Sequence, residues 1–275
     1  MHQFSCWCNF IYEQSKLDSN IKMKFLLPTK IPQFDFQFQL LVSQDYWTNF
    51  KKSPLKIAYS EDVYIAYDGQ FDEFLDYCPV GSIEFCRRHG IKTLPRNIPP
   101  QLKDYACGLV CSNRDEMKDS ICYWHVKSAK QIKHPKNGMY TNINDIPFED
   151  NEFQAVEYLK DGFLSEWRVF VLDGNIIDMQ NYAGDIWTLP SKNSVKSMIY
   201  AFEHAKGSNC PPAYTLDVGV HQDDIGLKTS IVEVHDFYAC GTYNLNDHYH
   251  YPIMLWEWWN WYHKTIANVQ TLSKS

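Results

Sequence analysis

Segment 165–174, with the sequence SEWRVFVLDG, predicts a buried strand that carries charges on one face. Side chains alternate between the two faces of a strand, so Glu166 and Arg168 share one face and the intervening apolar residues occupy the other. An ion buried without a partner is strongly destabilising, so it must be paired, hydrogen-bonded or bound to a ligand. The segment therefore indicates a strand with one packed face and one ionic face.

Two later apolar segments repeat this pattern. Asp217 lies within LDVGV at 216–220, and Glu233 and His235 share a face within IVEVHD at 231–236. If the three strands are neighbours, their charged faces form one polar floor. Carboxylate oxygens suit Mg²⁺, and the planar guanidinium of Arg168 suits phosphate oxygens. The set indicates a site for a polyphosphate and a metal ion, to which Lys127 adds a cation at the end of another strand.

The alternative interpretation is an ordinary sheet surface. Antiparallel strands commonly expose one polar face to solvent, where charged side chains pair with one another. Any one of these charges fits that description, and it is their combination on successive strands that favours a site.

The order of elements predicts an α+β fold with antiparallel pairing. Asp173 and Gly174 form a hairpin signal, and Val195, Met198 and Ile199 recur at helical spacing. The expected strands are 55–60, 63–67, 121–127, 153–159, 164–172, 175–182, 213–220 and 229–234. The expected helices run from a cap at Ser82 to His89, with Gly90 closing it, through the segment that contains Val195, and over 253–266.

Composition and motifs exclude several classes of protein. The 275 residues are 45% hydrophobic, which indicates a globular chain, and the net charge of −7 argues against a protein that binds nucleic acid by neutralising phosphates. No run reaches the ~18 apolar residues of a membrane span. Nine cysteines, an odd number at irregular spacing, favour a reducing compartment, so we expect a cytoplasmic protein. Neither a Walker-type loop, GxGxxG nor GxSxG is present.

The ordered set of motifs resembles the ATP-grasp proteins, in particular ATP-grasp domains of bacteria and their viruses. The matching segments are Lys127, EWRVFV at 166–171, DVG at 217–219, EVHD at 233–236 and GTY at 241–243. Upstream, PVGSIEF at 79–85 is similar to a segment that precedes the domain in that group. The resemblance covers residues 78–245. It implies an ATP-grasp fold with an N-terminal accessory α/β region, divided into a flexible extension at 1–22, a pre-ATP-grasp-like region at 23–115 and an ATP-grasp domain at 116–275.

The resemblance also implies an activity. ATP-grasp ligases bind ATP and Mg²⁺, phosphorylate a carboxylate to an acylphosphate and join it to an amine or similar nucleophile, with release of ADP and phosphate. The substrates would be a carboxylate and an amine, which can belong to a peptide or protein. The alternatives are an ATP-grasp kinase and a nucleotide-binding protein that has lost ligase chemistry and acts through partners.

Individual roles follow by position in the motifs. Arg168 would act on the γ-phosphate or acylphosphate as the catalytic residue. The residues that would bind ATP are Lys127, Lys133, Glu157, Tyr158, Leu159, Glu166 and Arg168, with Lys130 as the alternative second phosphate lysine and backbone groups of 157–159 reading the base. Metal would be held by Asp217, Glu233 and His235.

His235 is the one departure from the family pattern, which has asparagine at this position. Histidine suits softer divalent ions better than it suits Mg²⁺. Three readings follow: His235 binds an ion such as Mn²⁺, Asp236 replaces the missing ligand, or the site has lost a ligand. Near the end of the chain, Trp256, Trp258, Trp259 and Trp261 predict a helix that docks an aromatic face on the core.

Overall fold

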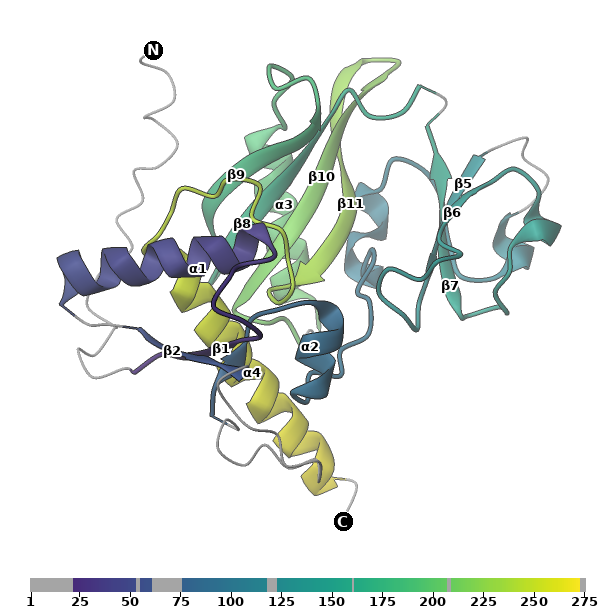
Figure 1. Ribbon diagram of the computed structural model, residues 1–275. Helices are drawn as coiled ribbons and strands as arrows, with labels where there is room; N and C mark the ends of the chain where they lie inside the picture. The colour runs from purple at the N-terminus through teal and green to yellow at the C-terminus, as the bar shows by residue number, and fades with distance from the viewer. Residues whose placement is uncertain are drawn as a thin grey trace.

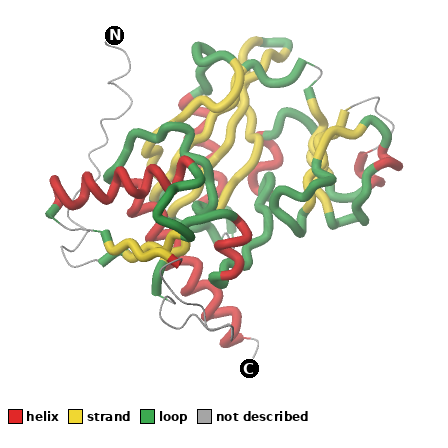
Figure 2. Tube along the Cα trace, in the orientation of Figure 1, coloured by secondary structure: helices red, strands yellow, loops and turns green. Residues whose placement is uncertain are grey.

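The structure is a computed structural model that describes residues 22–52, 55–60, 76–117, 123–159, 161–206 and 209–272, with side chains of the last helix described as far as residue 265. The described chain forms three sheets, which Figure 1 shows beside one another and Figure 2 colours by type of structure. This arrangement confirms the α+β prediction. Residues 1–21 of the predicted extension and the predicted strand at 63–67 lie outside the described residues.

The central sheet is antiparallel and has the order β11-β10-β8-β9. Its strands are β8 (Ser165–Leu172), β9 (Asn175–Gly184), β10 (Ala213–Asp223) and β11 (Gly226–Asp236). Asp173 and Gly174 join β8 to β9 with φ of 47° and 74°, the positive values that a tight hairpin turn of this kind requires. The strand predictions are confirmed, although β10 and β11 form a longer hairpin than alternation alone indicated.

Helix α3 (Lys192–His204) covers the apolar face of the central sheet. Ser191 caps it by accepting a hydrogen bond from the Ser194 amide at 3.3 Å. Val195, Met198, Ile199 and Phe202 are buried, as their spacing predicted. The opposite face of the sheet is therefore left for the charged side chains.

The side sheet has the order β4-β7-β5-β6 and lies next to the β11 edge of the central sheet (Figure 1). Its strands are β4 (Val110–Cys111), β5 (Tyr123–Ser128), β6 (Gly138–Tyr140) and β7 (Phe153–Tyr158). Short helices η6 (Pro100–Tyr105), η7 (Arg114–Met117) and η8 (Ile143–Asp145) connect these elements. Strand β4 precedes position 115 in the chain and pairs with β7, which follows it.

The N-terminal sheet is parallel and consists of β1 (Lys24–Leu27), β2 (Lys56–Tyr59) and β3 (Cys78–Pro79) in the order β2-β1-β3. Around it lie α1 (Asp35–Tyr46), η3 (Trp47–Lys51), α2 (Ile83–Arg88) and α4 (His250–Leu272). Ser82 caps α2 through the Phe85 amide at 3.2 Å, and Gly90 follows with φ of 90°, as predicted.

Helix α4 joins the N-terminal sheet to the central sheet through one shared core. Trp258 is fully buried, and its indole nitrogen donates to Asp236 at 3.3 Å. The same core contains Phe170 of β8 and Phe25 of β1. The prediction that the tryptophan-rich segment docks on the core is confirmed. No helix of the described residues is long and apolar enough to cross a membrane.

Candidate functional site

Strand pairing places the predicted charges side by side in the central sheet. Asp217 of β10 lies directly opposite Arg168 of β8 on one side and Glu233 of β11 on the other. The guanidinium of Arg168 donates two parallel hydrogen bonds to Asp217, from Nε at 2.8 Å and from Nη2 at 2.7 Å. Both side chains are almost fully buried, at 6% and 3% exposed. The polar floor expected from alternation is therefore present.

Arg168 is enclosed on its remaining sides by the segment that follows β11. Its Nη1 donates to the Gly241 carbonyl at 2.9 Å and lies 3.1 Å from the Cys240 sulfur, and the Tyr243 ring lies 4.9 Å away. Burial lowers the pKa of Arg168, but Cys240 and Asp217 outweigh this and the pKa is raised overall. Arg168 is therefore a fixed cation whose direction is set by its neighbours.

Glu233 connects the central sheet with the side sheet. Its carboxylate forms an ion pair with the Lys127 ammonium of β5 and lies 2.6 Å from His235 Nε2. Burial raises the pKa of Glu233, but His235 and Lys127 outweigh it and hold the pKa well below its usual range. The carboxylate is therefore ionised at neutral pH and accepts from both partners.

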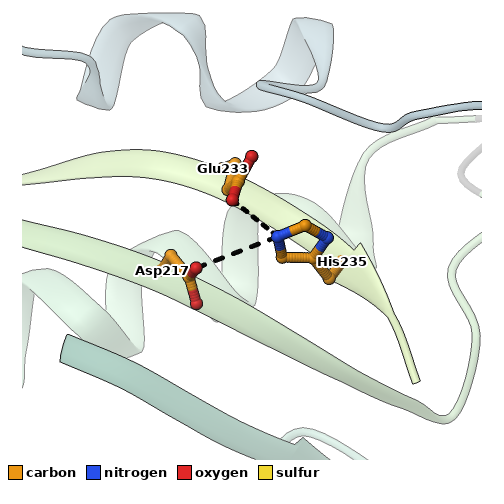
Figure 3. A group of neighbouring side chains, drawn as sticks. All are labelled: Asp217, Glu233 and His235. Carbon is orange, nitrogen blue, oxygen red and sulfur yellow. Dashed lines mark hydrogen bonds and ion pairs between the residues drawn. The ribbon is translucent and has the colours of Figure 1, made fainter. Parts of the chain in front are cut away.

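Asp217, Glu233 and His235 converge on one point, as Figure 3 shows. Their ligand atoms all lie within 4.8 Å of one another, and His235 Nε2 is 3.9 Å from Asp217 Oδ2. Ligands held at about 2.1 Å from a single ion are separated by about 3–4 Å, so this spacing fits one divalent cation. Two hard oxygen donors and one imidazole suit Mg²⁺ or a borderline ion such as Mn²⁺.

The cluster opens into a cavity of about 320 Å³ between the central sheet, the side sheet and segment 94–97. Most of the predicted phosphate and metal residues line it, namely Lys127, Lys133, Arg168, Asp217, Glu233 and His235. Lys130 is not among the lining residues and instead forms an ion pair with Glu152. Between the two candidate lysines, the cavity therefore favours Lys133.

Residues 111–252 match the model of an ATP-grasp domain family, the second family of its clade. The chain belongs to this ATP-grasp family. A RimK domain ATP-grasp protein from Sphaerobacter thermophilus has the same fold, with a TM-score of 0.51 and 9% identity over 85% of this chain and 98% of that chain. The resemblance inferred from the motifs is thereby confirmed at the level of family and fold.

Further ATP-grasp structures are similar at lower TM-scores. The ligase PsnB, solved with a phosphomimetic variant of its minimal precursor, Mg and ADP, gives a TM-score of 0.41 and 10% identity over 80% of this chain and 90% of that chain. N5-carboxyaminoimidazole synthetase from Staphylococcus aureus gives 0.43 and 11% identity over 78% of this chain and 71% of that chain. A search of curated proteins gave no match.

The remaining predicted residues of the ATP-grasp domain lie outside the lining of this cavity. Glu166 accepts a hydrogen bond from the Tyr182 hydroxyl at 2.9 Å on the same face as Arg168. Tyr158 shares a face of the side sheet with Lys127, because the register of β5 and β7 separates them by an even number of steps, whereas Glu157 lies on the opposite face. Tyr158 packs edge-on against Phe163, with ring centroids 6.5 Å apart.

Asp236 does not replace a metal ligand in the ATP-grasp cluster. Its carboxylate accepts from Arg96 Nε at 2.7 Å and from the Trp258 indole, and it is absent from the group of convergent ligands. One step along β11 turns its side chain away from the face that carries Glu233 and His235. Among the three readings of His235, the geometry supports His235 itself as the third ligand.

Sequence reasoning missed the residues that surround Arg168. Tyr243 belongs to the matched GTY segment, yet its role over the guanidinium depends on how the chain turns after β11. Tyr182 stacks on Tyr243 with ring centroids 5.1 Å apart. Asp35 contacts the same turn from the N-terminal region, 207 residues away along the chain. No local pattern signals such contacts.

Proposed function

We propose that this protein is an ATP-dependent ligase that joins a carboxylate to an amine or similar nucleophile. One observation carries the proposal: Arg168, Lys127 and the convergent set Asp217, Glu233 and His235 meet in a single cavity between the two sheets of an ATP-grasp domain. Cations and carboxylates held together in this way suit a nucleotide triphosphate with a divalent ion.

The proposed reaction has two steps. A carboxylate oxygen of the acid attacks the γ-phosphorus of ATP, the bond to the bridging oxygen breaks, and ADP leaves. The amine nitrogen then attacks the acyl carbon, phosphate leaves with the bonding electrons, and the amine loses a proton to solvent. The acid and the amine can be small molecules or belong to a peptide or protein.

The first step brings an anion toward a polyanion, so the site must neutralise charge as the phosphoryl group moves. Arg168 is already a fixed cation, and its position suits the γ-phosphate or the acylphosphate. Lys127 pairs with Glu233 across the two sheets, so a phosphate group would compete with Glu233 for its ammonium. Lys133 would add a further positive charge from the wall of the same cavity.

Asp217, Glu233 and His235 would hold Mg²⁺ or Mn²⁺. When bound, such an ion supplies positive charge to the phosphate oxygens and polarises the phosphorus–oxygen bonds. Within the chain, Lys127 and His235 must release Glu233 for this to occur. We propose that the base lies near the backbone of 157–159, where Tyr158 shares the face of Lys127. Glu166, held by Tyr182, completes the proposed nucleotide-binding set.

The N-terminal residues 23–115 are proposed to be an accessory region and 116–275 the ATP-grasp domain. The family match begins at residue 111, close to this boundary. Because β4 pairs with β7, residues just before the boundary complete the side sheet. We therefore propose that the accessory region works as part of the same folded unit.

ADP release tests the proposal. The purified chain is incubated with ATP, Mg²⁺ or Mn²⁺, and pools of carboxylates and amines. A ligase forms ADP that depends on both an acid and an amine, and Glu233→Gln abolishes it, whereas the exposed control Glu149→Gln does not. ADP formation from an acid alone would identify a kinase. Binding of ATP without turnover in any pool would favour a nucleotide-binding protein that lacks ligase chemistry.

A further inference from the structure

The segment 241–243, which we call the arginine loop, holds two of the contacts that fix Arg168. The Gly241 carbonyl accepts from Arg168 Nη1 at 2.9 Å, and the Tyr243 ring lies 4.9 Å from the guanidinium. These contacts add to the two hydrogen bonds that Asp217 accepts. The direction of the Arg168 guanidinium therefore depends on where the arginine loop lies.

The backbone of this region is strained. Ala239, Tyr243 and Asn244 all have positive φ, at 47°, 47° and 66°. Residues other than glycine adopt this conformation at a cost of about 1 kcal/mol or more each. Such a turn persists only when contacts outside it determine its path, so the hydrogen bonds that the loop receives are decisive for its position.

Asp35 supplies those hydrogen bonds from the N-terminal region. Its Oδ2 accepts from the Thr242 amide at 2.6 Å, from the Thr242 hydroxyl at 2.9 Å and from the Tyr243 amide at 3.0 Å. Thr242 is only 2% exposed, so its amide and hydroxyl need a partner inside the protein. One carboxylate oxygen thus satisfies three donors of the arginine loop.

Asp35 is itself held firmly because it is the first residue of α1. The Tyr251 hydroxyl of α4 donates to the Phe36 carbonyl at 3.0 Å, and Gln37 donates to the Val80 carbonyl at 3.1 Å. Farther along α1, the Gln39 side chain bonds His248 at 2.8 Å. The start of the helix is therefore tied to the core by several contacts next to Asp35.

We propose that Asp35 is a positioning residue that fixes the Arg168 guanidinium through the arginine loop. The effect on nucleotide binding rests on the proposed function, whereas the effect on Arg168 does not. The N-terminal region, which lies outside the family match, then contributes directly to the phosphate end of the site. Loss of Asp35 releases Gly241 and Tyr243 from Arg168 while the Asp217 pair remains.

The direct test observes Arg168 in the full-length protein. The Nε–H signal of Arg168 is followed by NMR with ¹⁵N-arginine, together with hydrogen exchange at the Thr242 and Tyr243 amides. Asp35→Ala should shift the signal and speed exchange at both amides at least tenfold, and Asp35→Asn, which keeps one oxygen acceptor, should give a smaller change. Asp45→Asn is the control, because Asp45 is exposed on the same helix, ten residues farther from the arginine loop.

A second measurement compares ATP with ADP by calorimetry, at a temperature at which every variant is folded. Because Arg168 is proposed to contact the γ-phosphate, Asp35→Ala should weaken ATP about tenfold while ADP changes little. A purely structural role of Asp35 would weaken both nucleotides equally or neither. An unchanged Arg168 signal in folded Asp35→Ala overturns the proposal, and so does an unchanged preference for ATP. If the wild type binds no nucleotide, the proposed function fails, and the NMR result alone decides the role of Asp35.

Discussion

At the scale of single residues, the Arg168–Asp217 pair governs both stability and the site. Two nearly buried charges meet in a bidentate geometry, so each depends on the other for compensation. The sequence predicted that both residues share a polar floor, because each lies between apolar neighbours on a strand. It did not predict that they pair, because pairing depends on the register of β8 and β10.

Removal of one partner should expose this dependence. Arg168→Leu leaves Asp217 buried without a counter-charge and should lower the free energy of unfolding by about 3–5 kcal/mol. The double variant Arg168→Leu with Asp217→Leu should recover most of that loss, because no buried charge of the pair remains. Urea unfolding of the three proteins measures both effects. A single variant as stable as the wild type would show that the pair is not buried as described.

His125 provides a pH test at the same scale. Burial, with help from Lys127 and against Glu233, lowers the pKa of His125 to about 4. Unfolded histidine titrates near ~6.5, so between these values the unfolded chain binds the proton more readily and stability falls as pH falls.

We expect this effect to destabilise the wild type by at most about 2 kcal/mol at pH 5, since each pKa unit corresponds to about 1.4 kcal/mol. His125→Gln cannot bind the proton and should lack the loss. Urea unfolding of both proteins at pH 7.5 and pH 5 compares the two changes in stability. An equal change in both would mean that His125 titrates normally in the folded protein.

At the scale of elements, alternation and turn signals predicted the central sheet well. The hairpin at Asp173–Gly174 and the helix containing Val195 follow from local rules. Helix α1 was not predicted, because its buried face includes the polar residues Gln37, Gln39 and Ser43 and so lacks apolar periodicity. The hydrogen bonds of these side chains compensate for their burial, and those of Gln37 and Gln39 reach distant groups that no local pattern shows.

Strand β10 also needs a glycine at one position. The Phe163 ring lies over Gly219, where an added Cβ would be 2.2 Å from a ring carbon. Gly219→Ala must therefore displace Phe163 from its contacts with the Tyr158 and His221 rings, and we expect a loss of about 1–3 kcal/mol.

Thermal unfolding measures this loss. Gly138→Ala on β6 is the matched control, because nothing lies within 4 Å of its added Cβ. If both alanine variants melt at the wild-type temperature, Phe163 is free to move and the close packing over β10 is not required.

At the scale of the whole molecule, the site depends on the central sheet, the side sheet and the N-terminal region together. The central sheet provides Arg168, Asp217 and Glu233, the side sheet provides Lys127, and the N-terminal region provides Asp35. Motif order identified the family and the charged residues of the two sheets. It could not assign Asp35, which has no motif and acts through contacts 207 residues apart.

Calorimetric titration with ATP, first with Mg²⁺ and then with Mn²⁺, tests the central claim that these elements enclose a nucleotide and metal site. The wild type should bind ATP in a manner that depends on the metal, and Glu233→Gln should lose that dependence, while Glu149→Gln binds like the wild type. Absence of binding with either metal, in folded protein, would contradict the account and leave the charged residues as ion pairs on a sheet face.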